Sequence, residues 1–194
     1  MSTTLPARQP RPQTVRPSNG KIILTIAIAA GVPAVLAGMA LAEQDRYSLQ
    51  VPNGLAFSDF RGYDTWQDVA VSQTEKGIKV IAANDVMMRA YRSGLPAEGK
   101  LFPDGSKVVK IEWTFKKNPQ SPYFVNVPDT LKSVSFIEKD TKRFPDTHGW
   151  AYAQFQYDAA SDAFRPNGND AKCGYACHTT VAAKDYIFTA CPKR

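Results

Sequence analysis

The sequence KVVKIEWTF at residues 107–115 alternates apolar and polar side chains, which is the pattern of a half-buried β-strand. Successive side chains of a strand point to opposite faces of the sheet, so this strand has two distinct faces. One face carries Val109, Ile111, Trp113 and Phe115, and the other carries Val108, Lys110, Glu112 and Thr114. We expect the first, wholly apolar face to pack against the core.

Further strands are predicted on both sides of this stretch, where β-branched and aromatic residues gather between turns that contain Pro or Gly. These predicted strands are residues 79–82, 123–127, 132–137 and 150–157. The last three follow one another so closely that little room remains for helical crossovers between them. The sheet should therefore be antiparallel.

Two helices are predicted before the central strand. Residues 58–71 begin with the small polar Ser58 and have roughly helical apolar spacing. A second helix is capped by Asn84 or Asp85 and ends before Gly94. The sequence thus predicts an α+β fold, in which a predominantly antiparallel β-sheet has flanking helices near the N- and C-terminal ends.

The N-terminal region has the composition of an export signal. Residues 22–41, IILTIAIAAGVPAVLAGMAL, contain no charge and follow a basic leader. Small residues at Ala40 and Ala42 suit a signal peptidase, and cleavage after Ala42 would leave residues 43–194 as one mature domain. Twenty apolar residues are also long enough for an uncleaved membrane anchor. In both cases the domain is predicted to lie in the periplasm, or on the outer face of a bacterial-type membrane.

Much of the basic excess lies in this leader. The 194-residue chain has a formal net charge of +6, from 24 basic and 18 acidic residues. Residues 1–42 contain four basic residues and no acidic one, so residues 43–194 keep 20 basic and 18 acidic residues and a net charge of +2. We expect no nucleic-acid partner for a domain with so small an excess.

The segment CGYACH at residues 173–178 carries the clearest chemical signal. A c-type haem needs two thiols that form thioethers with the porphyrin and an adjacent imidazole that binds the iron, usually in the spacing C-x-x-C-H. Here Cys173 and Cys177 are separated by one more residue, and His178 follows directly. Positions i and i+4 of a helix lie on the same face, so both thiols could still reach one haem edge.

Two other interpretations of the cysteines remain open. Two of the three could form a disulfide in an oxidising compartment, although the odd count then leaves one thiol unpaired. A zinc site would need Cys173, Cys177 and His178 with a fourth ligand such as Cys191. His148 is the only other histidine, and we expect it to be exposed in a turn.

Five segments of the chain resemble the cytochrome P-460 family. They are residues 84–92 (NDVMMRAYR), 102–113 (FPDGSKVVKIEW), 132–149 (KSVSFIEKDTKRFPDTHG), 150–155 (WAYAQF) and 173–189 (CGYACHTTVAAKDYIFT). The resemblance implies a periplasmic mono-haem c-type cytochrome, usually dimeric, that has an antiparallel sheet with flanking helices and is related to cytochrome c′-beta. Characterised members of the family oxidise hydroxylamine, or bind and process nitric oxide, at a five-coordinate iron.

The resemblance also implies roles for individual residues. Cys173 and Cys177 would carry the thioethers of haem c, and His178 would be the proximal iron ligand. In the family a lysine side chain is bonded to the haem macrocycle, and by its position after the Phe-Pro-x-Gly turn this lysine would be Lys110. A covering cofactor would desolvate Lys110 and favour its neutral, nucleophilic amine. Lys107 is out of phase with Lys110 across the pleat and is the weaker candidate.

Other residues have less defined roles. Glu112 shares a strand face with Lys110 and is the candidate base for removing protons from the substrate. Arg92 and Tyr152 are candidate pocket or packing residues. Cys191 is either a free thiol or the disulfide partner of one of the other two cysteines.

Three functions are consistent with these residues. The favoured one is a haem oxidoreductase that converts hydroxylamine to nitrous or nitric oxide and passes electrons to a soluble periplasmic acceptor. This protein would be a homodimer, and it would contact the membrane only if the leader is uncleaved. The second is a nitric-oxide-binding or electron-transfer cytochrome of the c′-beta type without turnover. The third is a haem-free periplasmic domain that is held together by a disulfide.

Overall fold

A computed structural model of the protein describes residues 43–193. The predicted signal peptide or anchor, residues 1–42, and its cleavage site after Ala42 lie outside these described residues. Within the described part of the chain, no helix is both long enough and apolar enough to cross a membrane.

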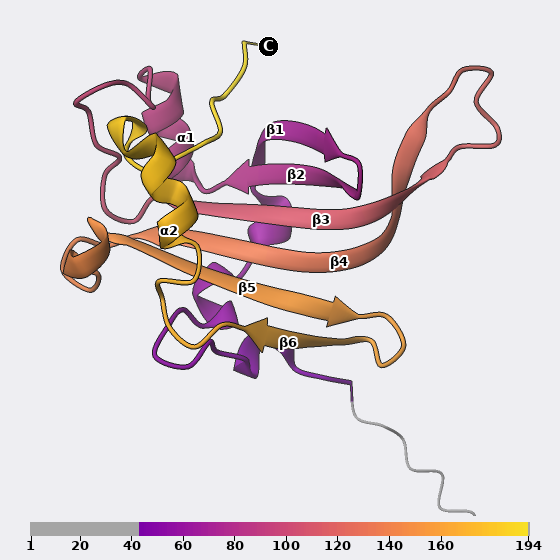
Figure 1. The fold of residues 1–194 in the computed structure, drawn as a ribbon, viewed down its shortest axis with the longest axis horizontal. Helices are drawn as coiled ribbons and strands as arrows, with labels where there is room; N and C mark the ends of the chain where they lie inside the picture. Colours follow the sequence, from indigo (N-terminus) through magenta and orange to yellow (C-terminus); the bar gives the residue numbers. More distant parts are fainter. Residues whose placement is uncertain (1–42, 194) are drawn as a thin grey trace, which may run out of the picture. The chain divides into compact units, whose positions relative to one another are not determined.

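The fold is built on one six-stranded antiparallel sheet whose strands follow their sequence order, β1 to β6 (Figure 1). The strands are β1 Gln67–Thr74, β2 Gly77–Ala83, β3 Lys107–Lys117, β4 Asn126–Lys139, β5 Trp150–Asp158 and β6 Ala163–Asn167. The predicted antiparallel sheet is confirmed, because every neighbouring pair of strands is antiparallel. The predictions for residues 79–82, 107–115, 132–137 and 150–157 correspond to β2, β3, β4 and β5.

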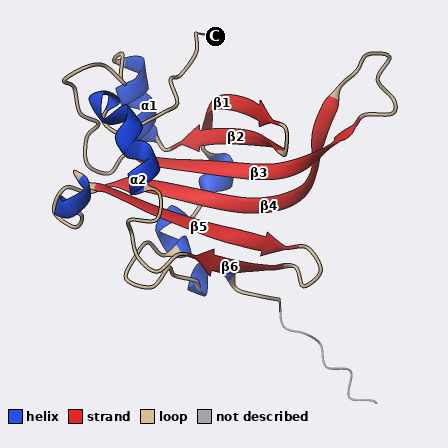
Figure 2. Cartoon of the chain, in the orientation of Figure 1, coloured by secondary structure: helices blue, strands red, loops and turns tan. Residues whose placement is uncertain are grey.

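Short helices surround the sheet (Figure 2). They are α1 Asp85–Arg92, α2 Tyr175–His178 and the 3₁₀ helices Arg46–Ser48, Phe57–Phe60, Tyr63–Thr65, Pro145–Thr147 and Thr179–Lys184. The predicted cap of α1 is confirmed: the Asn84 side chain accepts a hydrogen bond from the Met87 N–H at 3.0 Å. Helices precede β1 and follow β6, as expected for the predicted α+β fold.

The helix predicted over residues 58–71 is wrong. Gly62 has a left-handed φ of 77°, which interrupts the chain between two short 3₁₀ turns. From Gln67 onward the backbone pairs with β2, so that Gln67 lies opposite Ala83 and Thr74 lies opposite Gly77. Pairing within the sheet therefore overrides the helical spacing of the apolar residues.

The strand predicted over residues 123–127 is also largely wrong. Tyr123 and Phe124 lie in the loop of the β3–β4 hairpin, and they are 78% and 77% exposed. The loop is closed where the Asn118 N–H donates to the Val125 carbonyl at 2.8 Å, and β4 begins only at Asn126. These aromatic residues have a high strand propensity but no neighbouring strand with which to pair.

The sheet buries apolar side chains on both faces. On one face, Phe57 and Phe60 pack against Val109, Phe136 and Phe155. The rings of Phe60 and Phe136 are stacked with 4.1 Å between their centroids. This cluster confirms that the face with Val109 points to a core.

The opposite face carries a second apolar cluster. Met87 and Met88 of α1 pack there with Val108, Trp150 and Ile187. Helices α1 and α2 lie near the end of the sheet where β3 and β5 begin (Figure 1). The face that carries Val108 is therefore covered at this end, and the covering segments define the site described next.

Candidate functional site

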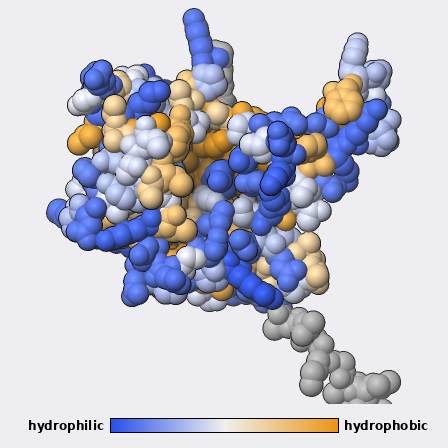
Figure 3. All heavy atoms as spheres, in the orientation of Figure 1, coloured by the Kyte–Doolittle hydropathy of each residue, from blue (hydrophilic) through white to orange (hydrophobic). Residues whose placement is uncertain are grey.

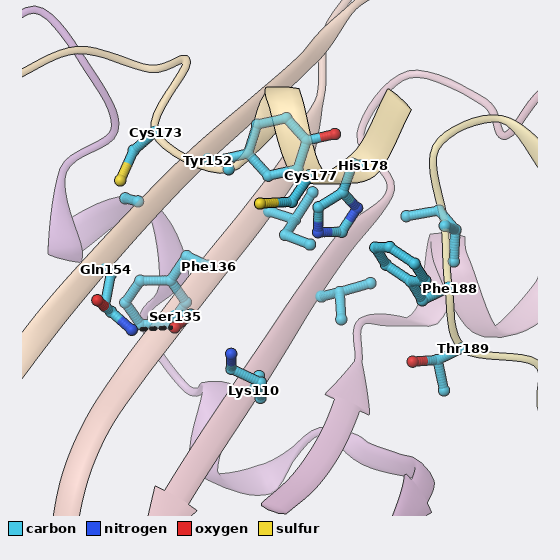
Figure 4. Close-up of a pocket in the computed structure, with 15 residues that line it drawn as sticks. Lys110, Ser135, Phe136, Tyr152, Gln154, Cys173, Cys177, His178, Phe188 and Thr189 are labelled. Carbon is cyan, nitrogen blue, oxygen red and sulfur yellow. Dashed lines mark hydrogen bonds between the residues drawn. The ribbon is translucent and has the colours of Figure 1, made fainter. Parts of the chain in front are cut away.

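A cavity of about 470 Å³ lies between the sheet and the C-terminal segment (Figure 4). Its lining includes Val108 and Lys110 of β3, Ser135, Phe136 and Ile137 of β4, and Tyr152, Ala153 and Gln154 of β5. The segment around α2 and the tail after it complete the lining with Cys173, Gly174, Cys177, His178, Ile187, Phe188 and Thr189. In the space-filling view, apolar side chains line a hollow on this face (Figure 3). The volume is in the range of small-molecule sites, roughly 300–1,000 Å³.

The predicted haem motif forms part of the cavity wall. The Tyr152 N–H donates to the Ala171 carbonyl at 2.7 Å, which ties the start of the motif to β5. Cys173 precedes α2, whereas Cys177 lies within it. The two thiols therefore do not share one helix, because the helix begins only after Gly174. The additional residue between the thiols is accommodated in the turn before the helix.

Gly174 lies against the ring of Tyr152. A Cβ atom at residue 174 would come within 2.8 Å of Tyr152 Cδ1, and Tyr152 is buried and cannot easily move away. We expect Gly174→Ala to lower the free energy of unfolding by about 1–3 kcal/mol through overpacking. Urea unfolding measures this loss, with Ala176→Ser on the exposed side of α2 as the control. Equal stabilities of the Gly174→Ala variant and the wild type would contradict the close contact.

His178 is held in an orientation that suits a metal ligand. Its Nδ1 lies 2.5 Å from the Tyr186 carbonyl oxygen, so Nδ1 carries the proton and donates it. The lone pair of Nε2 is then free for a metal ion, as in other histidine ligands whose second nitrogen is hydrogen-bonded. Burial lowers the pKa of His178, partly opposed by the Tyr186 hydrogen bond and aided by Lys110. The neutral imidazole, which is the form that binds metals, is thereby favoured.

Lys110 lies in the same cavity as His178. It is half-buried on β3 and is paired in register with Ile81 on one side and Ser135 on the other. Burial lowers the pKa of Lys110, and the charges of Lys79 and Lys132 lower it further, whereas Glu112 opposes them. This environment increases the fraction of neutral amine, the form that acts as a nucleophile and a base.

Lys107 points away from the cavity. Its Nζ donates to the Asp59 carbonyl at 2.7 Å and lies 3.3 Å from Oε1 of Glu138. These contacts hold its ammonium group on the opposite side of the pleat from Lys110, as the alternation of the strand predicted.

Glu112 is not brought to the cavity that contains Lys110 and His178. Its carboxylate pairs with Lys132 at 2.8 Å and with Lys79 at 3.7 Å. Burial acts to raise the pKa of Glu112, but the hydrogen bond from Lys132 and the neighbouring positive charges outweigh it, and the net pKa is lowered. The role of Glu112 as a base stays a prediction. The location of its carboxylate, outside the cavity and paired with two lysines, does not support this role.

Two other interpretations of the cysteines find no support in the described part of the chain. Cys173, Cys177 and Cys191 are all free, so the disulfide interpretation is not supported. In residues 43–193, no three His, Cys, Asp or Glu side chains lie close enough together to hold a metal ion, so the zinc interpretation has no ligand set. Cys191 is half-buried, packs beside the cluster of α1 and does not line the cavity.

The remaining candidate residues take different positions. Tyr152 lines the cavity, and its buried Oη has no hydrogen-bond partner among the described residues. Arg92 is an exposed residue that donates to Gln67 Oε1 at 2.6 Å. His148 is exposed, as expected, and its Nδ1 lies 2.6 Å from Tyr175 Oη. Arg92 and His148 therefore lie outside the cavity wall.

Sequence reasoning missed several residues that line the cavity. Gln154 Nε2 donates to Ser135 Oγ at 3.4 Å, and Asn167 donates to Gln154 Oε1 at 2.6 Å. Phe188 contacts His178 edge-to-face, with 4.8 Å between the ring centroids. Ser135 is the cross-strand neighbour of both Lys110 and Gln154, and this pairing depends on a strand register that local patterning does not reveal.

The donor set of this cavity fits the predicted haem. Two free thiols and one correctly protonated imidazole come from a single segment of the chain, and they face an apolar space. This combination is the one that covalent attachment and axial ligation of a c-type haem require.

Comparison with known families gives an independent result. The family model described as cytochrome P460 matches residues 60–189, a range that contains all of the residues that line the cavity. No curated protein matches the chain.

Proposed function

Because the chain belongs to the cytochrome P460 family of haem c cytochromes, we propose that it oxidises hydroxylamine at a haem in this cavity. Cys173 and Cys177 would hold the porphyrin through thioethers, and His178 Nε2 would bind the iron. When bound, the haem supplies an open coordination position for the substrate and accepts its electrons. The observation that carries the proposal is that the amine of Lys110 and the imidazole of His178 line the same apolar cavity.

Each of these residues has a defined task. His178 is restrained by the Tyr186 carbonyl, so its lone pair points to one side of the haem. Phe188 and Tyr152 flank the imidazole, with ring centroids 4.8 Å and 4.7 Å away, and limit the access of water. The apolar lining favours a small, uncharged ligand such as hydroxylamine.

Lys110 is the proposed site of a bond to the haem macrocycle. Its lowered pKa favours the neutral amine, which is the nucleophilic form. Forming this bond replaces one hydrogen on Nζ and one hydrogen on a macrocycle carbon. Formation of this bond is therefore a two-electron oxidation, and it requires an oxidant. A peroxide such as hydrogen peroxide is the proposed oxidant.

The reaction requires an electron acceptor. Two molecules of hydroxylamine yield nitrous oxide and water and release four protons and four electrons. We propose a soluble periplasmic acceptor for these electrons, and export to the periplasm through residues 22–41. A homodimer is the proposed assembly, and its mass in solution tests this.

A second candidate function is nitric oxide binding without turnover. It is favoured by one observation: no carboxylate lines the cavity in the described part of the chain, so no anionic base faces the substrate. Proton removal from hydroxylamine would then depend on Lys110 or on solvent.

Turnover distinguishes the two functions. We expect the purified haem protein to reduce a soluble one-electron acceptor when hydroxylamine is added, and Lys110→Met to lose this activity. The same substitution should move a red-shifted, broadened Soret band to the position of an ordinary haem c. Lys116→Met, which changes an exposed lysine of the same strand outside the cavity wall, is the control and should behave as the wild type. A wild type that binds nitric oxide but shows no turnover would favour the second function.

A further inference from the structure

A buried ion pair between Lys139 and Asp185 lies outside the cavity wall, and the function proposed above does not use it. Lys139 Nζ lies 2.8 Å and 3.0 Å from the two carboxylate oxygens of Asp185. Trp150 Nε1 also donates to Oδ1 at 3.1 Å, and the Phe102 N–H donates to Oδ2 at 2.7 Å. The side chains of Lys139 and Asp185 are only 2% and 1% exposed. The carboxylate is thus fixed by donors from β4, β5 and the loop before β3.

The residue that carries this carboxylate begins an unusual turn. Asp185 and Tyr186 have left-handed φ values of 49° and 62°, a conformation that non-glycine residues rarely adopt and that persists only when the surroundings impose it. Two backbone hydrogen bonds, from the Asp185 N–H to Ala182 and from the Tyr186 N–H to Val181, close the turn onto the helix after α2. The anchored carboxylate supplies the additional constraint.

The turn ends at the group that orients the iron ligand. The Tyr186 carbonyl follows directly after Asp185 and accepts the hydrogen bond from His178 Nδ1. No hydrogen bond joins Asp185 to His178, so the effect of Asp185 on the orientation of the imidazole passes through the backbone of the turn. A histidine ligand that donates its second N–H to a well-placed carbonyl becomes a stronger electron donor to its metal.

We propose that Asp185 is a positioning residue for the iron ligand, because its buried carboxylate holds the turn that aims the Tyr186 carbonyl at His178. This inference rests on the haem site proposed above, but it does not depend on hydroxylamine being the substrate. Lys139 and Trp150 act with Asp185, since they fix the carboxylate.

The test uses the haem-loaded protein and the variant Asp185→Asn. We expect its reduction potential to rise, because a weaker hydrogen bond makes His178 a poorer donor and destabilises ferric iron. The iron–histidine stretching frequency of the ferrous protein should fall for the same reason. Trp150→Phe removes only one of the bonds to the carboxylate and should shift both quantities in the same directions by smaller amounts.

A matched control separates positioning from stability. Phe57→Leu weakens the core on the opposite face of the sheet without touching the network, and its potential should equal that of the wild type. A folded Asp185→Asn protein with the wild-type potential and stretching frequency would overturn the proposal. If that variant does not fold, an unchanged potential in Trp150→Phe would overturn it instead. A wild type that contains haem but lacks hydroxylamine turnover would contradict the proposed function alone.

Discussion

Replacing Cys173 and Cys177 together by alanine is expected to abolish covalent haem attachment. Both thiols are free and line the cavity, and no other described cysteine lines it. Without a thioether, His178 alone would hold the haem, and denaturation would release it. The intact mass of the variant should therefore equal that of the bare polypeptide, whereas the wild type should carry the additional mass of the haem.

Cys191→Ala is the matched control for this experiment. Cys191 packs beside the cluster of α1 and does not line the cavity, so its replacement should leave the haem mass and the visible spectrum unchanged. A wild-type protein without haem, produced together with a working maturation system, would contradict the proposed cytochrome. Loss of haem in Cys191→Ala would instead assign this third thiol a role in attachment.

Lys139→Met is expected to cause the largest loss of stability among the substitutions considered. It leaves the Asp185 carboxylate buried without its charged partner, and such losses amount to about 3–5 kcal/mol. The effect should appear as a lower urea midpoint of unfolding. Replacing both partners, as Lys139→Met with Asp185→Asn, should recover part of this loss, because no unpaired charge then remains buried and the amide oxygen can still accept a hydrogen bond from Trp150 or Phe102.

Lys116→Met is the control for the loss of an ion pair. Lys116 lies 2.7 Å from Asp129, but their side chains are 62% and 36% exposed, so water screens the attraction. The expected change is at most about 1 kcal/mol. Equal losses in the Lys116 and Lys139 variants would contradict the view that burial determines the strength of the Lys139 interaction.

The elements predicted correctly are those with strong local signals. The alternation over 107–115 separates Val109 from Lys110, and the cap at Asn84 marks the start of α1. β1 was missed because its first residues were included in the helix predicted over 58–71, and most of its side chains are polar and exposed. β6 was missed because it is short and contains Pro166, a residue that disfavours strands.

The candidate site was predictable only in part. The spacing of the thiols and the imidazole indicates haem, since that chemistry depends on residues that are close in sequence. The cavity itself is formed by strand register and by the return of residues 187–189, and both are tertiary features. Glu112 is an example. Its strand face could be predicted from the sequence, but its ion pairs with Lys79 and Lys132 depend on neighbouring strands and could not.

The position of Gly174 separates two steps in the formation of the protein. Thioether formation adds each thiol across a vinyl group of the haem and does not need contact with Tyr152, so a bulkier residue at 174 should still permit it. Docking of this segment onto Tyr152 is weakened by a Cβ atom at this position, which would lie 2.8 Å from Tyr152 Cδ1. Substitutions here should therefore yield a fully matured polypeptide whose haem-bearing segment detaches readily from the sheet, so that biosynthesis and final assembly can be studied one at a time.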